Sequence, residues 1–261
     1  VLAIVLGSNA LFTMGAARDD DRATVRAHDR QMLDVTAAAA SPISSVIIRG
    51  SLAAVADRSG RVRLMQVGAG AEPLREIAST SGNEGTAGLH LTKRETLIAA
   101  GQRVVMRFPA PYKTPLPMAL RTAPTAFAAD DAYAFIGTQN GSVDVYDLAI
   151  GRPVTTYTLS SDDRITALYR LTGAMLVVGT GALDGRVLVV DVVESKVVHR
   201  VEPHDEAFGV VCLAADARGR IVASGGDDGS VALIDPLKGR VLARLRVPET
   251  PTAMAFEPSG R

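Results

Sequence analysis

The sequence "GTGALDG" at residues 179–185 has the glycine spacing of loops that hold phosphate groups. In a dinucleotide-binding fingerprint, such a loop joins a strand to a helix, and the helix N-terminus holds the pyrophosphate. Here the loop is followed by the apolar sequence "RVLVVD", which is typical of a strand. We therefore predict a β-hairpin at this position rather than a nucleotide-binding loop.

Several acidic and histidine residues could in principle bind a metal ion. The aspartates at 19–21 and at 227–228 lack the alternating spacing and the terminal glutamate of a calcium loop. His199 and His204 have a spacing found in zinc sites, but no third ligand lies near them in the sequence. A nucleophile elbow is also absent from the sequence. We therefore predict no catalytic residue, no cofactor and no metal site.

The composition argues against several partner classes. The chain has 28 basic and 28 acidic residues, so its net charge draws it neither to nucleic acid nor to an anionic membrane. No stretch reaches the roughly 18 apolar residues that a membrane helix needs. Cys212 is the only cysteine, so no internal disulfide can form, and we expect a buried, inert thiol. We expect an intracellular protein, cytoplasmic rather than nuclear or organellar, without membrane insertion and without nucleic acid as a direct target.

A short sequence motif recurs along most of the chain. Five turn-and-strand segments begin 42, 39, 44 and 44 residues apart, at Gly60, Gln102, Gly141, Gly185 and Gly229. A period of about 40 to 45 residues is typical of propeller blades. The last complete copy reads as four strands, at 210–214, 221–224, 230–235 and 241–247, separated by turn-forming Gly, Asp and Pro residues.

The strand before each of these turns is almost wholly apolar, as in "MLVVG" at 175–179. Such a strand should be buried on both faces, because an exposed face would carry polar residues at alternate positions. Four-stranded sheets that bury both faces must stack on other sheets. The repeat therefore predicts a ring of stacked sheets.

The sequence "HDEAFGVVCLAADARGRIVASGGDDGSVALIDP", residues 204–236, resembles one repeat of the WD-repeat (WD40-like) β-propeller family. The resemblance implies that His204, Ser224 and Asp228 form a hydrogen-bonded structural support. Ile234 stands where the family has a tryptophan, and the chain has no tryptophan at all. The period of the repeat extends over nearly the whole chain, whereas the family's sequence motif covers a smaller part.

We expect an all-β fold, a single β-propeller domain of four-stranded antiparallel blades. The expected number of blades is six, or seven if the chain is part of a longer propeller. Residues 1–36 should supply three strands and 250–261 a fourth, which would close the ring and leave no open sheet edge. The blades are expected at residues 1–36 with 250–261, 37–80, 81–122, 123–159, 160–202 and 203–248.

The resemblance implies a non-catalytic platform for protein–protein interaction, a scaffold or adaptor within a larger assembly. In the family's layout, the recognition face carries the loops that enter the first strand and the loops between the second and third strands. We expect other proteins or peptides to bind there, with arginines as typical anchors. The expected partner-binding residues are Arg58, Gln102, Arg103, Asn140, Arg164, Asp184, Glu206 and Asp227.

An alternative is a propeller enzyme, either a metal-dependent hydrolase or a quinone-dependent oxidoreductase, with its site in the central channel. Quinone-binding propellers would be expected to carry tryptophan-bearing repeats, and this chain has none. A metal-dependent hydrolase would need acidic, amide or histidine residues on the innermost strands. The expected innermost strands offer only His90.

Overall fold

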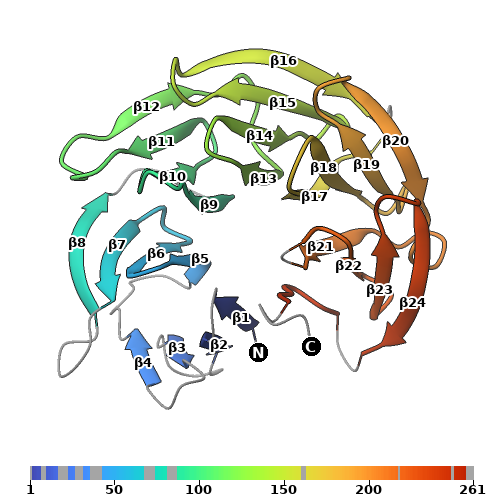
Figure 1. Ribbon diagram of the computed structural model, residues 1–261, viewed down its shortest axis with the longest axis horizontal. Coiled ribbons are helices and arrows are strands. Elements are labelled where there is room, and N and C mark those ends of the chain that lie inside the picture. The colour runs from blue at the N-terminus through green and yellow to red at the C-terminus, as the bar shows by residue number, and fades with distance from the viewer. Residues whose placement is uncertain are drawn as a thin grey trace. The chain divides into compact units, whose positions relative to one another are not determined.

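The computed structural model of this chain describes residues 2–6, 10–16, 23–26, 32–35, 43–67, 74–80, 87–159, 163–216, 218–247 and 250–256. All the regular elements in these ranges are β-strands, labelled β1 to β24 in Figure 1. They form four-stranded antiparallel sheets in which each strand pairs with its neighbours in sequence. By contact, the chain divides into two compact units, one of residues 1–124, 130–132 and 148–152 and one of residues 125–129, 133–147 and 153–261.

The first unit holds three sheets. One consists of β1 (Leu2–Leu6), β2 (Ala10–Ala16), β3 (Ala23–Arg26) and β4 (Met32–Val35). The next consists of β5 (Ile43–Arg49), β6 (Leu52–Asp57), β7 (Val62–Val67) and β8 (Leu74–Thr80), and the third of β9 (Gly88–Leu91), β10 (Leu97–Ala100), β11 (Val104–Phe108) and β12 (Leu116–Ala119). Buried residues of the second and third sheets share one core, which includes Ala54, Leu64, Leu91 and Leu97.

The other three sheets belong mainly to the second unit. They consist of β13 (Ala126–Ala129), β14 (Tyr133–Gly137), β15 (Ser142–Asp147) and β16 (Arg152–Thr158); of β17 (Ile165–Arg170), β18 (Met175–Thr180), β19 (Val187–Asp191) and β20 (Lys196–Val201); and of β21 (Val210–Ala215), β22 (Val222–Gly226), β23 (Ser230–Asp235) and β24 (Arg240–Arg246). Innermost strands of adjacent sheets lie against each other, β13 with β17 and β17 with β21.

The second strand of each blade is buried on both faces, as its apolar sequence predicts. In β18, Leu176 and Val178 pack in a core with Phe135 of the preceding blade. Val177, which points to the other face, packs in a core with Val210 of the following blade. Alternate side chains of one strand therefore join the blades on either side, and the blades stack face to face.

Glycines permit this close stacking. A Cβ atom on Gly137 would lie 2.7 Å from Cγ2 of Ile165, and one on Gly179 would lie 2.6 Å from Cγ1 of Val210. In each case a bulky side chain of the following innermost strand fills the space that the glycine leaves free. The same sequence position therefore determines how closely each blade approaches the next.

Hydrogen bonds at the outer rim of the second unit also join adjacent blades. The Tyr157 hydroxyl on β16 donates to the Val192 carbonyl of the next blade at 2.9 Å. Nε2 of His199 on β20 lies 3.0 Å from the Leu237 carbonyl of the last blade. Both carbonyls belong to the turn between the third and fourth strands, so the same kind of contact is repeated from blade to blade.

The expected all-β propeller of four-stranded antiparallel blades is confirmed, but the expected count is wrong. The structure shows five blades, built from β5 to β24, and not six or seven. In the described part of the chain, β1 to β4 pair with one another and with no strand of the C-terminal segment, so the expected shared blade is not formed there. The sequence predicts three strands in this region, whereas the structure has a fourth, Ala23–Arg26, which is only four residues long and lies in a charged stretch.

The described C-terminal residues 250–256 form no strand. They nevertheless pack against the last blade, because a Cβ atom on Gly225 would lie 2.7 Å from Cγ of Pro251. The thiol of Cys212 also donates to the Pro251 carbonyl at 3.3 Å. Pro251 therefore takes the same position against β22 that Val210 takes against β18, although its segment pairs with no strand in the described part of the chain.

The contact between Gly179 and Val210 gives a test of this stacking. We expect Gly179→Ala to lower the free energy of unfolding by about 1–3 kcal/mol, because the added methyl group overpacks the interface between two blades. Val210→Ala should be destabilising by itself, but in the double variant it removes Cγ1 and so relieves the closest contact, although Cβ of residue 210 remains 2.9 Å from the added methyl group. Denaturant unfolding of the four proteins should therefore give a double variant that is more stable than the sum of the two single effects predicts. Additive effects would contradict the contact.

Candidate functional site

A cleft of about 420 Å³ opens among the three blades of the second unit. This volume is in the range of sites that bind small ligands or short peptide segments. The cleft is formed where chain segments enter the innermost strands and where loops join the second and third strands. Its lining residues are Thr125, Arg164, Ile165, Thr166, Gly181, Ala182, Gly209, Val210, Val211 and Asp227.

β-Bulges at the start of two innermost strands help to shape the cleft. The pairing of β17 with β18 shifts between Ile165 and Ala167, which leaves Thr166 as the extra residue. The pairing of β21 with β22 shifts in the same way around Val211. A bulge redirects the side chain of the extra residue and is often found beside functional sites. Thr166 and Val211 therefore occupy equivalent positions in adjacent blades.

Two glycines, Gly181 and Gly209, let the loops of adjacent blades meet in this cleft. A Cβ atom on Gly209 would lie 3.0 Å from the backbone nitrogen of Ala182, and one on Gly181 would lie 2.4 Å from Oδ1 of Asp163. The buried Asp163 carboxylate also accepts a hydrogen bond from the Asp184 amide at 2.9 Å. The loop after β18 is therefore held against its own blade on one side and against Gly209 on the other.

Arg164 and Asp227 bring opposite charges to the cleft. Gly181 donates its amide to the Arg164 carbonyl, and Asp227 donates its amide to the Gly209 carbonyl, both at 3.0 Å. The backbone of Arg164 is therefore hydrogen-bonded directly to Gly181, and the backbone of Asp227 directly to Gly209. Both side chains are exposed, and within the described ranges neither the guanidinium nor the carboxylate has a hydrogen bond or an ion pair. The cleft therefore presents a cation and an anion that are not neutralised by each other.

The cleft also contains two hydroxyl groups without partners. Oγ1 of Thr125 and Oγ1 of Thr166 are buried and accept or donate no hydrogen bond among the described residues. Ser44, the extra residue of the corresponding bulge in β5, instead donates to the Ala56 carbonyl at 3.2 Å. An unsatisfied buried hydroxyl costs about 1–3 kcal/mol. A ligand that reached these groups would recover part of that free energy.

The turn that carries Asp227 is positioned by a hydrogen-bonded network beneath it. Nε2 of the buried His204 lies 2.8 Å from Oγ of Ser224, and its Nδ1 lies 2.9 Å from Oγ of Ser230. Asp228 Oδ1 lies 3.3 Å from the same Nδ1 and also accepts the Ser230 amide at 2.9 Å. The structure thus joins His204, Ser224 and Asp228, the three residues for which the sequence resemblance implies a structural support, and adds Ser230.

Burial lowers the pKa of His204, and Arg244 acts in the same direction, whereas Asp228 and Asp205 oppose the shift. The folded protein therefore resists protonation of a group that takes up a proton in the unfolded chain near pH 6.5. We expect the free energy of unfolding to fall as the pH decreases from 7 to 5, because the unfolded chain takes up the proton that the folded His204 resists. His204→Gln should be less stable at pH 7 and should lose less stability on acidification, as followed by denaturant unfolding at each pH. An unchanged pH dependence in the variant would contradict a neutral, buried His204.

Five of the expected partner-binding residues lie in the second unit, and the cleft brings two of them, Arg164 and Asp227, together. Asn140 accepts hydrogen bonds from Ser142 and Thr138 and so stabilises its own turn. Asp184 forms an ion pair with Arg186 at 2.6 Å. Glu206 is exposed in the segment that enters β21 but does not line the cleft.

The other three expected residues lie in the first unit. Arg58 is exposed in the turn between β6 and β7, where the buried Asp57 carboxylate accepts the Ser59 amide at 3.0 Å. Gln102 and Arg103 are exposed in the turn between β10 and β11. All three lie at the same end of their blades as the loops expected for recognition.

Sequence reasoning did not identify Thr125, Thr166, Gly181 or Gly209 as site residues. A signal was available for the threonines, because "PTAFA" and "ITALY" place them at the same position of the repeat. The glycines carried no such signal, since their role depends on the contact between two loops of different blades. A glycine in a loop is usually explained by the local turn alone.

The residues considered for metal or thiol chemistry lie elsewhere. Among the described residues, no group of three or more His, Cys, Asp or Glu side chains could hold a metal ion. His90 lies on the innermost strand β9, where burial and Arg49 lower its pKa. Burial raises the pKa of the Cys212 thiol to about 11. The described part of the chain also contains no helix long and apolar enough to cross a membrane.

Comparison of the chain with models of known protein families and with curated proteins gave no match.

Thr166 and Val211 provide a matched pair for testing the unpartnered hydroxyl. We expect Thr166→Val to raise the free energy of unfolding by about 1 kcal/mol, because it replaces a buried, unsatisfied hydroxyl by a methyl group of similar size. Val211 shows that the equivalent bulge accommodates valine. Thermal unfolding should show an increase in Tm of roughly 3 °C. A lower Tm would mean that the hydroxyl is satisfied in the free protein.

Proposed function

We propose that this chain is a non-catalytic interaction platform of the WD-repeat type, which binds other proteins or peptides in the cleft of the second unit. The observation that carries the proposal is the unneutralised pair of charges, Arg164 and Asp227, presented by loops of two adjacent blades. Loops on a rigid scaffold are common binding sites, because the scaffold fixes the contact groups at low entropic cost.

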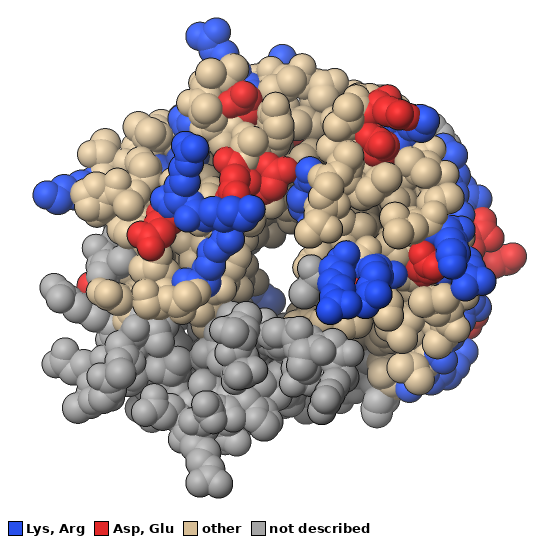
Figure 2. Space-filling view, in the orientation of Figure 1, with Lys and Arg blue, Asp and Glu red and all other residues tan. Residues whose placement is uncertain are grey.

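The surface charges support a protein or peptide partner. In the view of Figure 2, acidic and basic side chains are interspersed over the described blades. The net charge is zero, so attraction of a polyanion by the whole molecule is not expected. Recognition then depends on local charges, and both signs are present in the cleft. We place the platform in the cytoplasm, as a scaffold or adaptor within a larger assembly.

Site-specific photo-crosslinking tests this proposal. Ala182 is exposed and lines the cleft, whereas Val193, which is 78% exposed, lies in the turn at the other end of β19. We expect a photoreactive residue at 182 to form adducts with specific proteins in an extract of the cells that express the chain. The same residue at 193 should not form them, and gel analysis with mass spectrometry distinguishes the two patterns.

The charge reversal Arg164→Glu with Asp227→Arg, added to the variant at 182, should abolish the adducts. Each substitution reverses an exposed charge that lines the cleft, so the fold should be retained, and circular dichroism and thermal unfolding would verify this. Identical adducts at 182 and 193, or adducts that survive the charge reversal, would rule out the cleft as the binding site.

A further inference from the structure

We propose that the cleft recognises a peptide segment in which one acidic and one basic side chain lie close together. This inference rests on the proposed platform function and specifies the chemistry of its ligand. In it, Arg164 binds the acidic side chain of the ligand and Asp227 binds the basic one. The hydroxyls of Thr125 and Thr166 form hydrogen bonds with polar groups of the peptide segment that lies between its acidic and basic side chains.

The arrangement of the two charges supports a ligand with both signs. Arg164 and Asp227 come from different blades and are separated by Gly181 and Gly209, which meet in the middle of the cleft. Within the described part of the chain, no residue neutralises either side chain. A purely anionic ligand would meet the Asp227 carboxylate, and a purely cationic one would meet the Arg164 guanidinium. A ligand with one charge of each sign satisfies both and encounters no repulsion.

The floor between the charges suits an extended peptide. Gly181 and Gly209 close the floor between the charges, because Asp163 and the backbone of residues 181–182 occupy the space that side chains at these positions would fill. Oγ1 of Thr125 and Oγ1 of Thr166 are buried near this floor without a hydrogen-bond partner. Rotation of about 120° about χ1 of a threonine moves its hydroxyl to another staggered position, so a hydroxyl can turn toward a bound peptide group. The cleft volume of about 420 Å³ accommodates a segment of a few residues.

The neighbouring charged groups do not compete for these roles. The Asp163 carboxylate is buried behind Gly181, where it accepts the Asp184 amide. Asp184 pairs with Arg186, and Arg186 also contacts Glu202 at 3.2 Å. These groups hold the loop after β18 and leave Arg164 and Asp227 as the charged lining residues of the cleft.

Fluorescence anisotropy with synthetic peptides tests this inference. The probes are labelled peptides in which a glutamate and a lysine are separated by none, one, two or three alanines, in both orders. Matched probes carry glutamine in place of the glutamate or in place of the lysine. We expect one spacing and one order to bind best. Loss of either charge from that peptide should weaken binding about tenfold or more, since hydrogen bonds between charged groups are the strong ones.

Variants of the protein give the second arm of the test. Arg164→Glu should abolish the requirement for the ligand glutamate, and Asp227→Arg the requirement for the lysine. The double reversal should prefer the opposite order of charges, because the floor of the cleft fixes the direction of the peptide backbone. Thr166→Val should weaken binding severalfold while the protein remains folded.

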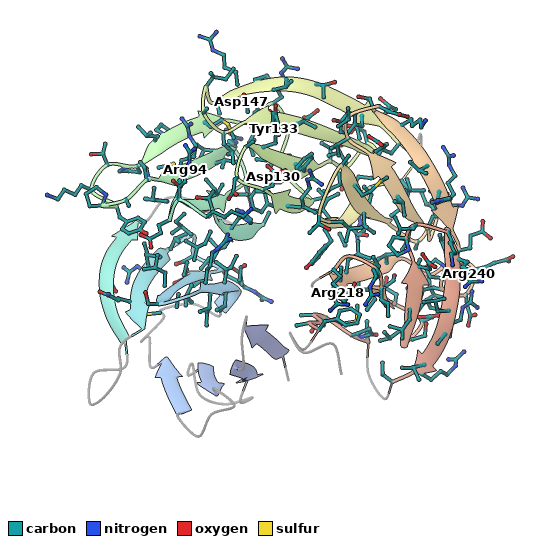
Figure 3. The ribbon with its side chains drawn as sticks, in the orientation of Figure 1. Arg94, Asp130, Tyr133, Asp147, Arg218 and Arg240 are labelled. Atoms are coloured by element: carbon teal, nitrogen blue, oxygen red, sulfur yellow. The ribbon has the colours of Figure 1, made fainter. Side chains whose placement is uncertain are left out.

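Arg218→Glu is the matched control for a change of charge. Arg218 is exposed on the turn between β21 and β22 (Figure 3), at the other end of β21 from the cleft residue Val210. This variant should bind the best peptide as tightly as the unaltered chain does. An equal loss of binding in Arg218→Glu and Arg164→Glu would show a general charge effect and would overturn the inference.

Two outcomes separate this inference from the proposed function. If no peptide binds at millimolar concentration while crosslinking at 182 remains specific, the platform stands and the proposed ligand chemistry is wrong. The inference is also wrong if the double variant prefers peptides with the same order of glutamate and lysine as the unaltered chain does, and binds them with the same affinity. Failure of both experiments would remove the cleft as a binding site altogether.

Discussion

The structure depends on the burial of both faces of the second strand in each blade. An isolated four-stranded sheet would leave both apolar faces of this strand in water, and the hydrophobic cost is avoided only when another sheet covers each face. In β18, alternate residues contribute to two separate cores, one with the preceding blade and one with the following blade. Stacking of blades is therefore a direct consequence of the sequence of one strand.

Close stacking places the loops of adjacent blades side by side and so creates the cleft. Gly137 and Gly179 admit Ile165 and Val210 from the next blade, and these residues begin the segments that line the cleft. The bulges that follow redirect the side chains of their extra residues, Thr166 and Val211. The contacts that stabilise the blades thus also fix the positions of the residues proposed to bind a ligand.

Stability and binding oppose each other at some positions of the cleft. The Thr166 hydroxyl is buried without a hydrogen-bond partner among the described residues, which we expect to destabilise the free protein, whereas the equivalent Val211 carries no polar group. The exposed charges of Arg164 and Asp227 form no hydrogen bond or ion pair with the described residues. By contrast, Asn140, Asp163, Asp184 and His204 use their polar groups to hold the loops in place. Residues that position the loops and residues available to a ligand can therefore be distinguished by whether their polar groups are already satisfied.

The sequence by itself determined the four-stranded blade, its period and the turns, because alternation of apolar residues and the placement of glycine are local properties of the chain. It also indicated which loops share one end of the blades, and so included Arg164 and Asp227 among the expected residues. Only the tertiary structure decided that these two lie in one cleft, that Asn140 and Asp184 are engaged within their own loops, and that β1 to β4 form a separate sheet. These outcomes depend on contacts between distant segments and on the competition of strands for partners, neither of which is encoded in any short stretch of sequence.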